Sequence, residues 1–115
     1  AAVNKANNGS TPLCKAAQRG HAAAVTALLE AGAEVNWDMD RGATPLFIAA
    51  QNGHAVILRA LLDSGAEVDA LFDKESTPLH VAAQNGHAAV VAMLALAGAD
   101  VNLALNDGFT TWSKR

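Results

Sequence analysis

The chain has little of what several classes of protein require. Its 115 residues include one cysteine, Cys14, no tyrosine and only 4% aromatic residues. A single cysteine excludes an intramolecular disulfide and favours a reducing compartment. No apolar run is long enough to span a bilayer, and the first residues lack the charged-then-apolar pattern of a secretion signal. We therefore expect an intracellular, cytoplasmic protein with no membrane partner.

Charged residues are also scarce and mixed in sign. They make up 17% of the chain and leave a formal net charge of -3, with no strongly basic segment. Such a surface does not attract nucleic-acid phosphates strongly. Glycine-rich phosphate loops, zinc-ligand spacings and paired catalytic carboxylates are missing from the sequence as well. We expect no nucleic-acid partner, no cofactor, no metal and no catalysis.

What the sequence does contain is a repeat with a period of 33 residues. Thr-Pro-Leu occurs at residues 11–13, 44–46 and 77–79, and each copy is followed by Ala-Ala-Gln and then Gly-His. Each unit closes with Gly-Ala, an acidic residue and valine, at residues 32–35, 65–68 and 98–101. The length and these motifs resemble the ankyrin repeat, and the resemblance covers nearly the whole chain.

The resemblance implies a single all-α domain over residues 1–115. Its expected architecture is a solenoid of stacked antiparallel helix pairs with projecting β-turn fingers. The units run over residues 8–40, 41–73 and 74–106, after an abbreviated finger at the N-terminal end and before a partial fourth repeat, 107–115. Three complete units are about the minimum for a stable array.

Proline and glycine predict where the helices begin and end. In each unit a proline follows a threonine that can cap the helix, and glycine then stops the helix. The predicted first helices are 12–19, 45–52 and 78–85, and the second helices are 22–31, 55–64 and 88–97. After Val35, Val68 and Val101 the pattern changes to period two, which predicts an extended finger.

Several residues that could carry chemistry have simpler explanations. His21, His54 and His87 recur once per unit, so stacking holds them about 10 Å apart, too far to share one metal. We expect a structural Gly-His step that bonds or packs locally. His80 is the histidine that the family commonly has after Thr-Pro-Leu, where it braces a neighbouring loop. Cys14 with His21 lacks an orienting carboxylate, so a buried thiol is expected.

The resemblance implies recognition of another protein through finger tips and the concave surface of the first helices. The fingers carry apolar residues where the family commonly has a turn aspartate, together with aromatic residues and charged tips. The predicted partner-binding residues are Trp37, Met39, Arg41, Phe72, Lys74, Leu105, Asp107 and Phe109 in the fingers and Gln51, Asn52, Gln84 and Asn85 on the helices. The alternative is that the apolar finger residues pack on their own helices or close the turn. The acidic fingers favour a partner with an apolar strip flanked by basic groups.

A second interface is expected at the C-terminal end. Residues 88–97 are apolar all round, and such helices are normally buried. Ala89, Ala92 and Leu96, with Trp112 as a partial cap, are candidates for contact with further repeats or with a second copy of the chain.

Two alternatives to this function stay open. The chain could be a structural spacer in a longer array, or an engineered binder built on an ankyrin scaffold.

A modification is a separate possibility. Asn36 and Asn102 resemble ankyrin asparagines that are hydroxylated, and the simpler interpretation is that they brace the finger turn.

Overall fold

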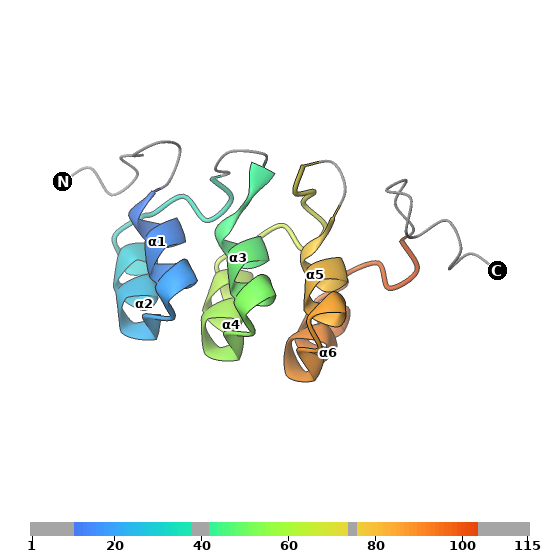
Figure 1. The fold of residues 1–115 in the computed structure, drawn as a ribbon. Helices are drawn as coiled ribbons and strands as arrows, with labels where there is room; N and C mark the ends of the chain where they lie inside the picture. Colours follow the sequence, from blue (N-terminus) through green and yellow to red (C-terminus); the bar gives the residue numbers. More distant parts are fainter. Residues whose placement is uncertain (1–10, 38–41, 74–75, 104–115) are drawn as a thin grey trace.

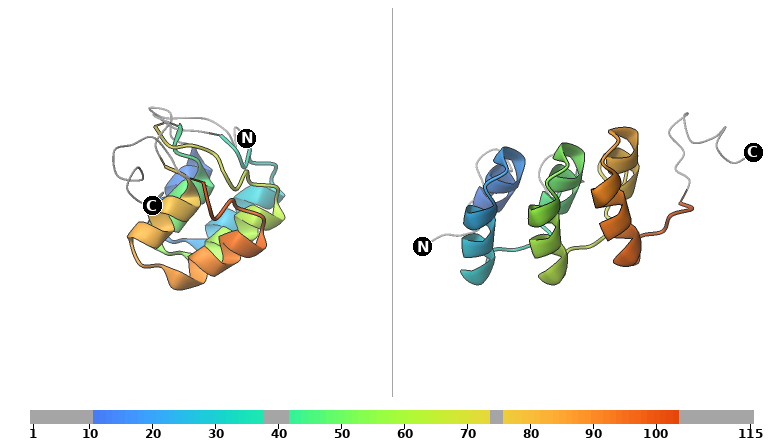
Figure 2. Two further views of the ribbon diagram at one scale, coloured as in Figure 1. Left: turned by 90° about the vertical axis from the view of Figure 1, so that its right-hand side faces the viewer. Right: turned by 90° about the horizontal axis from the view of Figure 1, so that it is seen from below.

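A computed structural model describes residues 11–37, 42–73 and 76–103. These residues form six α-helices: α1 Pro12–Arg19, α2 Ala22–Glu30, α3 Pro45–Asn52, α4 Ala55–Asp63, α5 Pro78–Gln84 and α6 Ala88–Leu96. The helices form three antiparallel pairs that stand in a row, as Figures 1 and 2 show. The predicted all-α solenoid is confirmed, and only α5 and the second helices differ in extent, each ending one residue earlier than predicted.

The first helix of every repeat begins at the same capped proline. The side-chain oxygens of Thr11, Thr44 and Thr77 each accept a hydrogen bond from the backbone N–H three residues later, at 3.2–3.3 Å. The prolines that follow lack an N–H, which no helical partner would have satisfied at that position. Each threonine side chain is almost fully buried, so the cap also belongs to the core.

Stacking of the repeats completes the core. The helix α3 contacts both α1 and α5, and α4 contacts both α2 and α6. Ala49 and Ala50 on α3 have no exposed surface, because small side chains let neighbouring first helices approach closely. Ile48 is buried, whereas Lys15 at the same position of the first repeat is exposed. One repeat therefore buries its apolar face only when another repeat stands beside it.

The described part of the chain contains almost no extended pairing. One isolated antiparallel bridge joins Phe72 to Ser76 in the second finger. Asp73 follows Phe72 with a φ of 53°, which reverses the chain there. Within the described ranges, no helix is long and apolar enough to cross a membrane.

The histidines of the second and third Gly-His steps, His54 and His87, contact the preceding repeat. The ring of His87 lies against Gly53, and its Nε2 is 3.0 Å from the carbonyl oxygen of Gln51. His54 lies against Gly20 in the same way. The expected structural role is right, but its direction differs, because the glycine leaves room for a ring from the next repeat. Among the described residues, no group of three metal-ligating side chains occurs.

This contact predicts different costs for two equivalent glycines. Gly53 and Gly86 both have a left-handed backbone, with φ of 71° and 77°. A β-carbon at Gly53 would lie 2.6 Å from Nδ1 of His87, whereas none of the described atoms lies within 4 Å of one at Gly86. We expect Gly53→Ala to lower the free energy of unfolding by about 1 kcal/mol more than Gly86→Ala, because the ring must move. Urea denaturation measures both losses.

A second substitution separates the steric contact from backbone strain. His87→Ala removes the clashing ring but also its hydrogen bond to Gln51. It should therefore cost less stability in the Gly53→Ala background than in the unchanged chain. Equal losses for the two glycine variants, and an equal cost of His87→Ala in both backgrounds, would show that the ring adapts without cost.

Candidate functional site

A groove lies between α1, α3 and the second finger. We call it the first-helix groove, and its volume is about 310 Å³. Its lining residues come from two adjacent repeats and are Gln18, Ala43, Phe47, Ile48, Gln51, Asn52 and Phe72. Three of the predicted partner-binding residues, Gln51, Asn52 and Phe72, are thus brought together around one hollow.

Two stacked phenylalanines form the apolar wall of this groove. The ring centroids of Phe47 and Phe72 are 4.6 Å apart, and the planes meet at 21°. The bridge between Phe72 and Ser76 holds the finger in position, with N–O distances of 2.7 and 3.2 Å. Phe72 is half-buried, so it packs on the first helix of its own repeat and still lines the groove. Packing and recognition, which the sequence posed as alternatives, are compatible for this residue.

The wall is specific to the second repeat. The position of Phe47 holds Cys14 in the first repeat, where the side chain is buried, and His80 in the third. His80 places Nδ1 2.7 Å from the side-chain oxygen of Thr77, so it contacts the cap of its own helix. Phe47 and Gln18 are not among the predicted partner-binding residues. The available signal was that two of the three phenylalanines fall in one repeat, at the helix start and the finger.

The helix asparagines connect adjacent first helices. Nδ2 of Asn52 donates to the carbonyl oxygen of Gln18 at 3.5 Å, and Nδ2 of Asn85 donates to that of Gln51 at 3.0 Å. Both asparagines are exposed, as are Gln51 and Gln84. The asparagine side chains therefore have a structural role, while Gln18 and Gln51 are exposed and line the groove.

A second line of hydrogen bonds connects the loops that follow the second helices. Nδ2 of Asn36 donates to the carbonyl oxygen of Gly65 at 3.3 Å, and Oδ1 accepts from the N–H of Glu67 at 2.8 Å. Asp69, at the equivalent position of the next repeat, accepts from the N–H of Asp100 at 3.3 Å. Asn36 thus braces one repeat against the next, while residues 38–41 of its own finger turn lie outside the described residues.

The remaining predicted finger residues are only partly described. Trp37 is 38% exposed and stands beside the braced Asn36. The other predicted finger residues, and the cap at the C-terminal end, lie outside the described residues: Met39, Arg41, Lys74, Leu105, Asp107, Phe109 and Trp112.

The candidates for a second interface face outward from α6. Ala89, Ala92 and Leu96 are all exposed, and Leu96 is 87% exposed. In the repeat register they correspond to positions on α2 and α4 that are exposed too. A neighbouring repeat leaves those positions uncovered, so further stacking would not be expected to cover these three residues.

Other residues of the third repeat lie where stacking would cover them. Val101 is 63% exposed, whereas Val35, two repeats earlier, is 9% exposed beneath its neighbour. Ala83 is exposed, whereas the equivalent Ala50 is fully buried. The apolar surface at this end of the described chain therefore includes Ala83 and Val101, which are not among the residues predicted for a second interface.

Comparison with known proteins agrees with the geometry. A protein-family model described as ankyrin repeats (3 copies) matches residues 1–71 and 32–104, which together cover most of the chain. No curated protein matches the sequence.

The line of hydrogen bonds at Asn36 gives a direct prediction. Replacing Asn36 by alanine removes two hydrogen bonds to the next repeat, so we expect a loss of about 1 kcal/mol in the free energy of unfolding. Asn102 has the same repeat position but no described repeat beyond it, so Asn102→Ala should change stability by less than about 0.5 kcal/mol. Thermal and urea unfolding of both variants check the difference. Equal losses would mean that the side chain acts within its own loop.

Proposed function

Because the chain belongs to the ankyrin repeat family, whose repeats generally mediate binding between proteins, we propose that it binds a partner protein through the first-helix groove and the adjoining fingers. The proposed role is non-catalytic, as is typical of ankyrin repeat proteins. The observation that carries the proposal is the groove itself. It combines an apolar wall of Phe47 and Phe72 with exposed amides at Gln51 and Asn52.

The chemistry of the groove indicates the kind of contact it would make. A bulky apolar side chain of the partner would pack against the edge of the phenylalanine pair, where aromatic contact adds to area burial. The side-chain amides of Gln18 and Gln51 carry both donors and acceptors, so they can pair with the backbone of the same partner segment. Interfaces with an apolar centre and a polar rim have this composition.

The finger tips extend the proposed surface. Trp37 is exposed and aromatic, and aromatic residues dominate the binding energy of many interfaces. We include Met39, Arg41, Lys74, Leu105, Asp107 and Phe109, together with Gln84 and Asn85, on the basis of the repeat register. The fingers are acidic in sequence, so the proposed partner presents an apolar strip flanked by basic groups. An intracellular, cytoplasmic location is part of the same proposal.

A contact at the C-terminal end is the second candidate. The exposure of Val101 and Ala83, at positions that are buried in earlier repeats, favours further repeats or a second copy of the chain there. In that case the chain could act as a spacer. Sedimentation that shifts with concentration would support self-association, and a strict monomer would remove it.

Selection of peptides on the intact chain tests the leading proposal. A peptide library displayed on phage supplies binders, and fluorescence polarisation measures the affinity of a selected peptide. We expect Gln51→Ala and Trp37→Ala each to weaken binding about tenfold, which corresponds to the 1.4 kcal/mol typical of a contributing interface residue. Circular dichroism should be unchanged, because both side chains are exposed.

The matched control is Val56→Ala. Val56 is 73% exposed on α4 and does not line the first-helix groove, so its loss should leave affinity unchanged. Phe72→Ala is informative only alongside its unfolding curve, since Phe72 also packs on α3. Binding that is insensitive to Gln51 and Trp37 but lost on changing Val56 would refute the proposed surface.

A further inference from the structure

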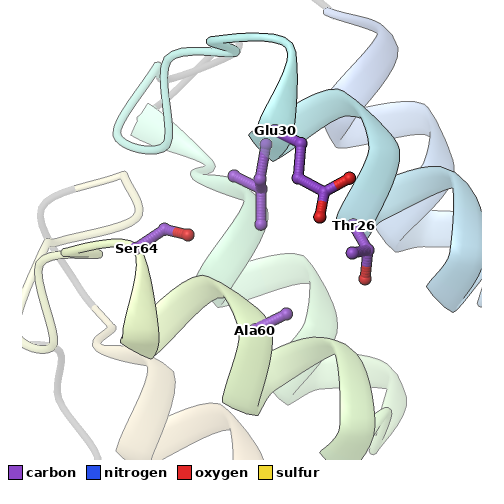
Figure 3. A pocket seen from close by; sticks show the side chains of 5 residues that line it. Thr26, Glu30, Ala60 and Ser64 are labelled. Carbon is purple, nitrogen blue, oxygen red and sulfur yellow. The ribbon is translucent and has the colours of Figure 1, made fainter.

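A second groove runs between α2 and α4, the second helices of adjacent repeats. Figure 3 shows Thr26 and Glu30 on one side and Ala60 and Ser64 on the other. With Leu29, these residues line a volume of about 240 Å³, which we call the second-helix groove. It shares no lining residue with the first-helix groove, so the two surfaces are separate.

The lining of this groove combines an apolar surface with oxygen atoms. Leu29 and Ala60 are partly buried and pack on the core. The polar side chains are two hydroxyls, from Thr26 and Ser64, and the carboxylate of Glu30. Thr26 and Glu30 are four residues apart on α2, so they share one helix face. No lining side chain carries a nitrogen, and all three polar side chains can accept a hydrogen bond.

The helix ends make the same place electrically negative. The helices α2 and α4 end at Glu30 and Asp63, and the last turn of each contains no basic residue. Backbone carbonyls at a helix C-terminus carry a partial negative charge, which disfavours an acidic side chain there and favours a cation. Two adjacent repeats therefore place a carboxylate where local electrostatics oppose it. The third repeat has Leu96 at this position.

Arg59 is the cation of α4 nearest to the groove in sequence. It precedes the lining residue Ala60, and its side chain is exposed. Arg59 does not itself line the groove. The negative charge of the groove is thus available to a cation from outside the chain.

We propose that the second-helix groove binds a lysine side chain of a partner protein. The four-carbon stem packs on Leu29 and Ala60, and the ammonium group lies beside the carboxylate of Glu30, with the hydroxyls as further acceptors. A compact ammonium with three donors suits a narrow groove whose polar groups are all acceptors, whereas a planar guanidinium requires a wider, forked arrangement. This surface is an additional docking site that stands independently of the first-helix groove.

Titration with a single blocked amino acid tests the chemistry directly. The probe is N-acetyl-lysine-N-methylamide, added to the intact chain with ¹⁵N label and followed by nuclear magnetic resonance. We expect saturable shifts at the amides of Thr26, Glu30, Ala60 and Ser64. The norleucine analogue has the same stem without the charge and should give no saturable shift. Chemical shifts that rise linearly with probe concentration, or that are equal for the two probes, would overturn the proposal. Tighter binding of the arginine analogue would overturn the choice of lysine.

Two glutamine variants separate the groove from general charge. Glu30→Gln should weaken the lysine probe about fivefold, because it removes the one carboxylate that lines the groove. Glu67→Gln changes the net charge equally, but Glu67 does not line the groove. This variant should therefore bind the lysine probe with the same affinity as the unchanged chain. Equal weakening by both variants would show that only net charge matters.

Two further measurements check that the Glu30 variant still folds and that Arg59 affects binding as the electrostatics predict. Glu30→Gln should leave the melting temperature unchanged or raise it, since it removes an acid from a helix C-terminus. Arg59→Ala should strengthen binding of the lysine probe, because it removes a nearby like charge. Weaker binding after Arg59→Ala would contradict the proposed electrostatics.

Discussion

Contact between neighbouring repeats is the interaction on which the rest of this structure depends. A helix pair of this size has too little apolar surface to fold alone, so each repeat completes its core against the next. The middle repeat shows the effect most clearly, because Leu46, Ala49 and Ala50 have no exposed surface. Polar side chains also form hydrogen bonds with a neighbouring repeat. Asn36, Asn85 and His87 all bond to backbone atoms about one repeat away.

The helices could be predicted from the sequence because their signals are local. A capping threonine, a proline at the first helical position and a glycine at the end lie within about ten residues and act within one turn. The contacts between repeats could not be predicted in the same way. Nothing in the local sequence of His87 says that its ring fills the space beside Gly53. Likewise, the stacking of Phe47 on Phe72 depends on how a finger folds back on its helix, which no single motif encodes.

The candidate surfaces follow from the same stacking. Adjacent first helices and a finger enclose the first-helix groove, and adjacent second helices enclose the second-helix groove. Gln51, Asn52 and Phe72, which line the first-helix groove, could be proposed from the sequence because their residue types stand out at repeat positions. Phe47, Glu30 and Ser64 could not, since a groove between repeats combines side chains about 30 residues apart.

Native-state hydrogen exchange tests the dependence on stacking most directly. Helix α3 packs on both sides, so its amides, including that of Ala50, should exchange only through global unfolding. The equivalent amides of α5, including that of Ala83, should exchange faster, because the described chain covers that face less. Protection that peaks in α3 and falls toward α5 and α6 is the predicted result. Uniform protection along the six helices, or greater protection in α6 than in α3, would contradict the account.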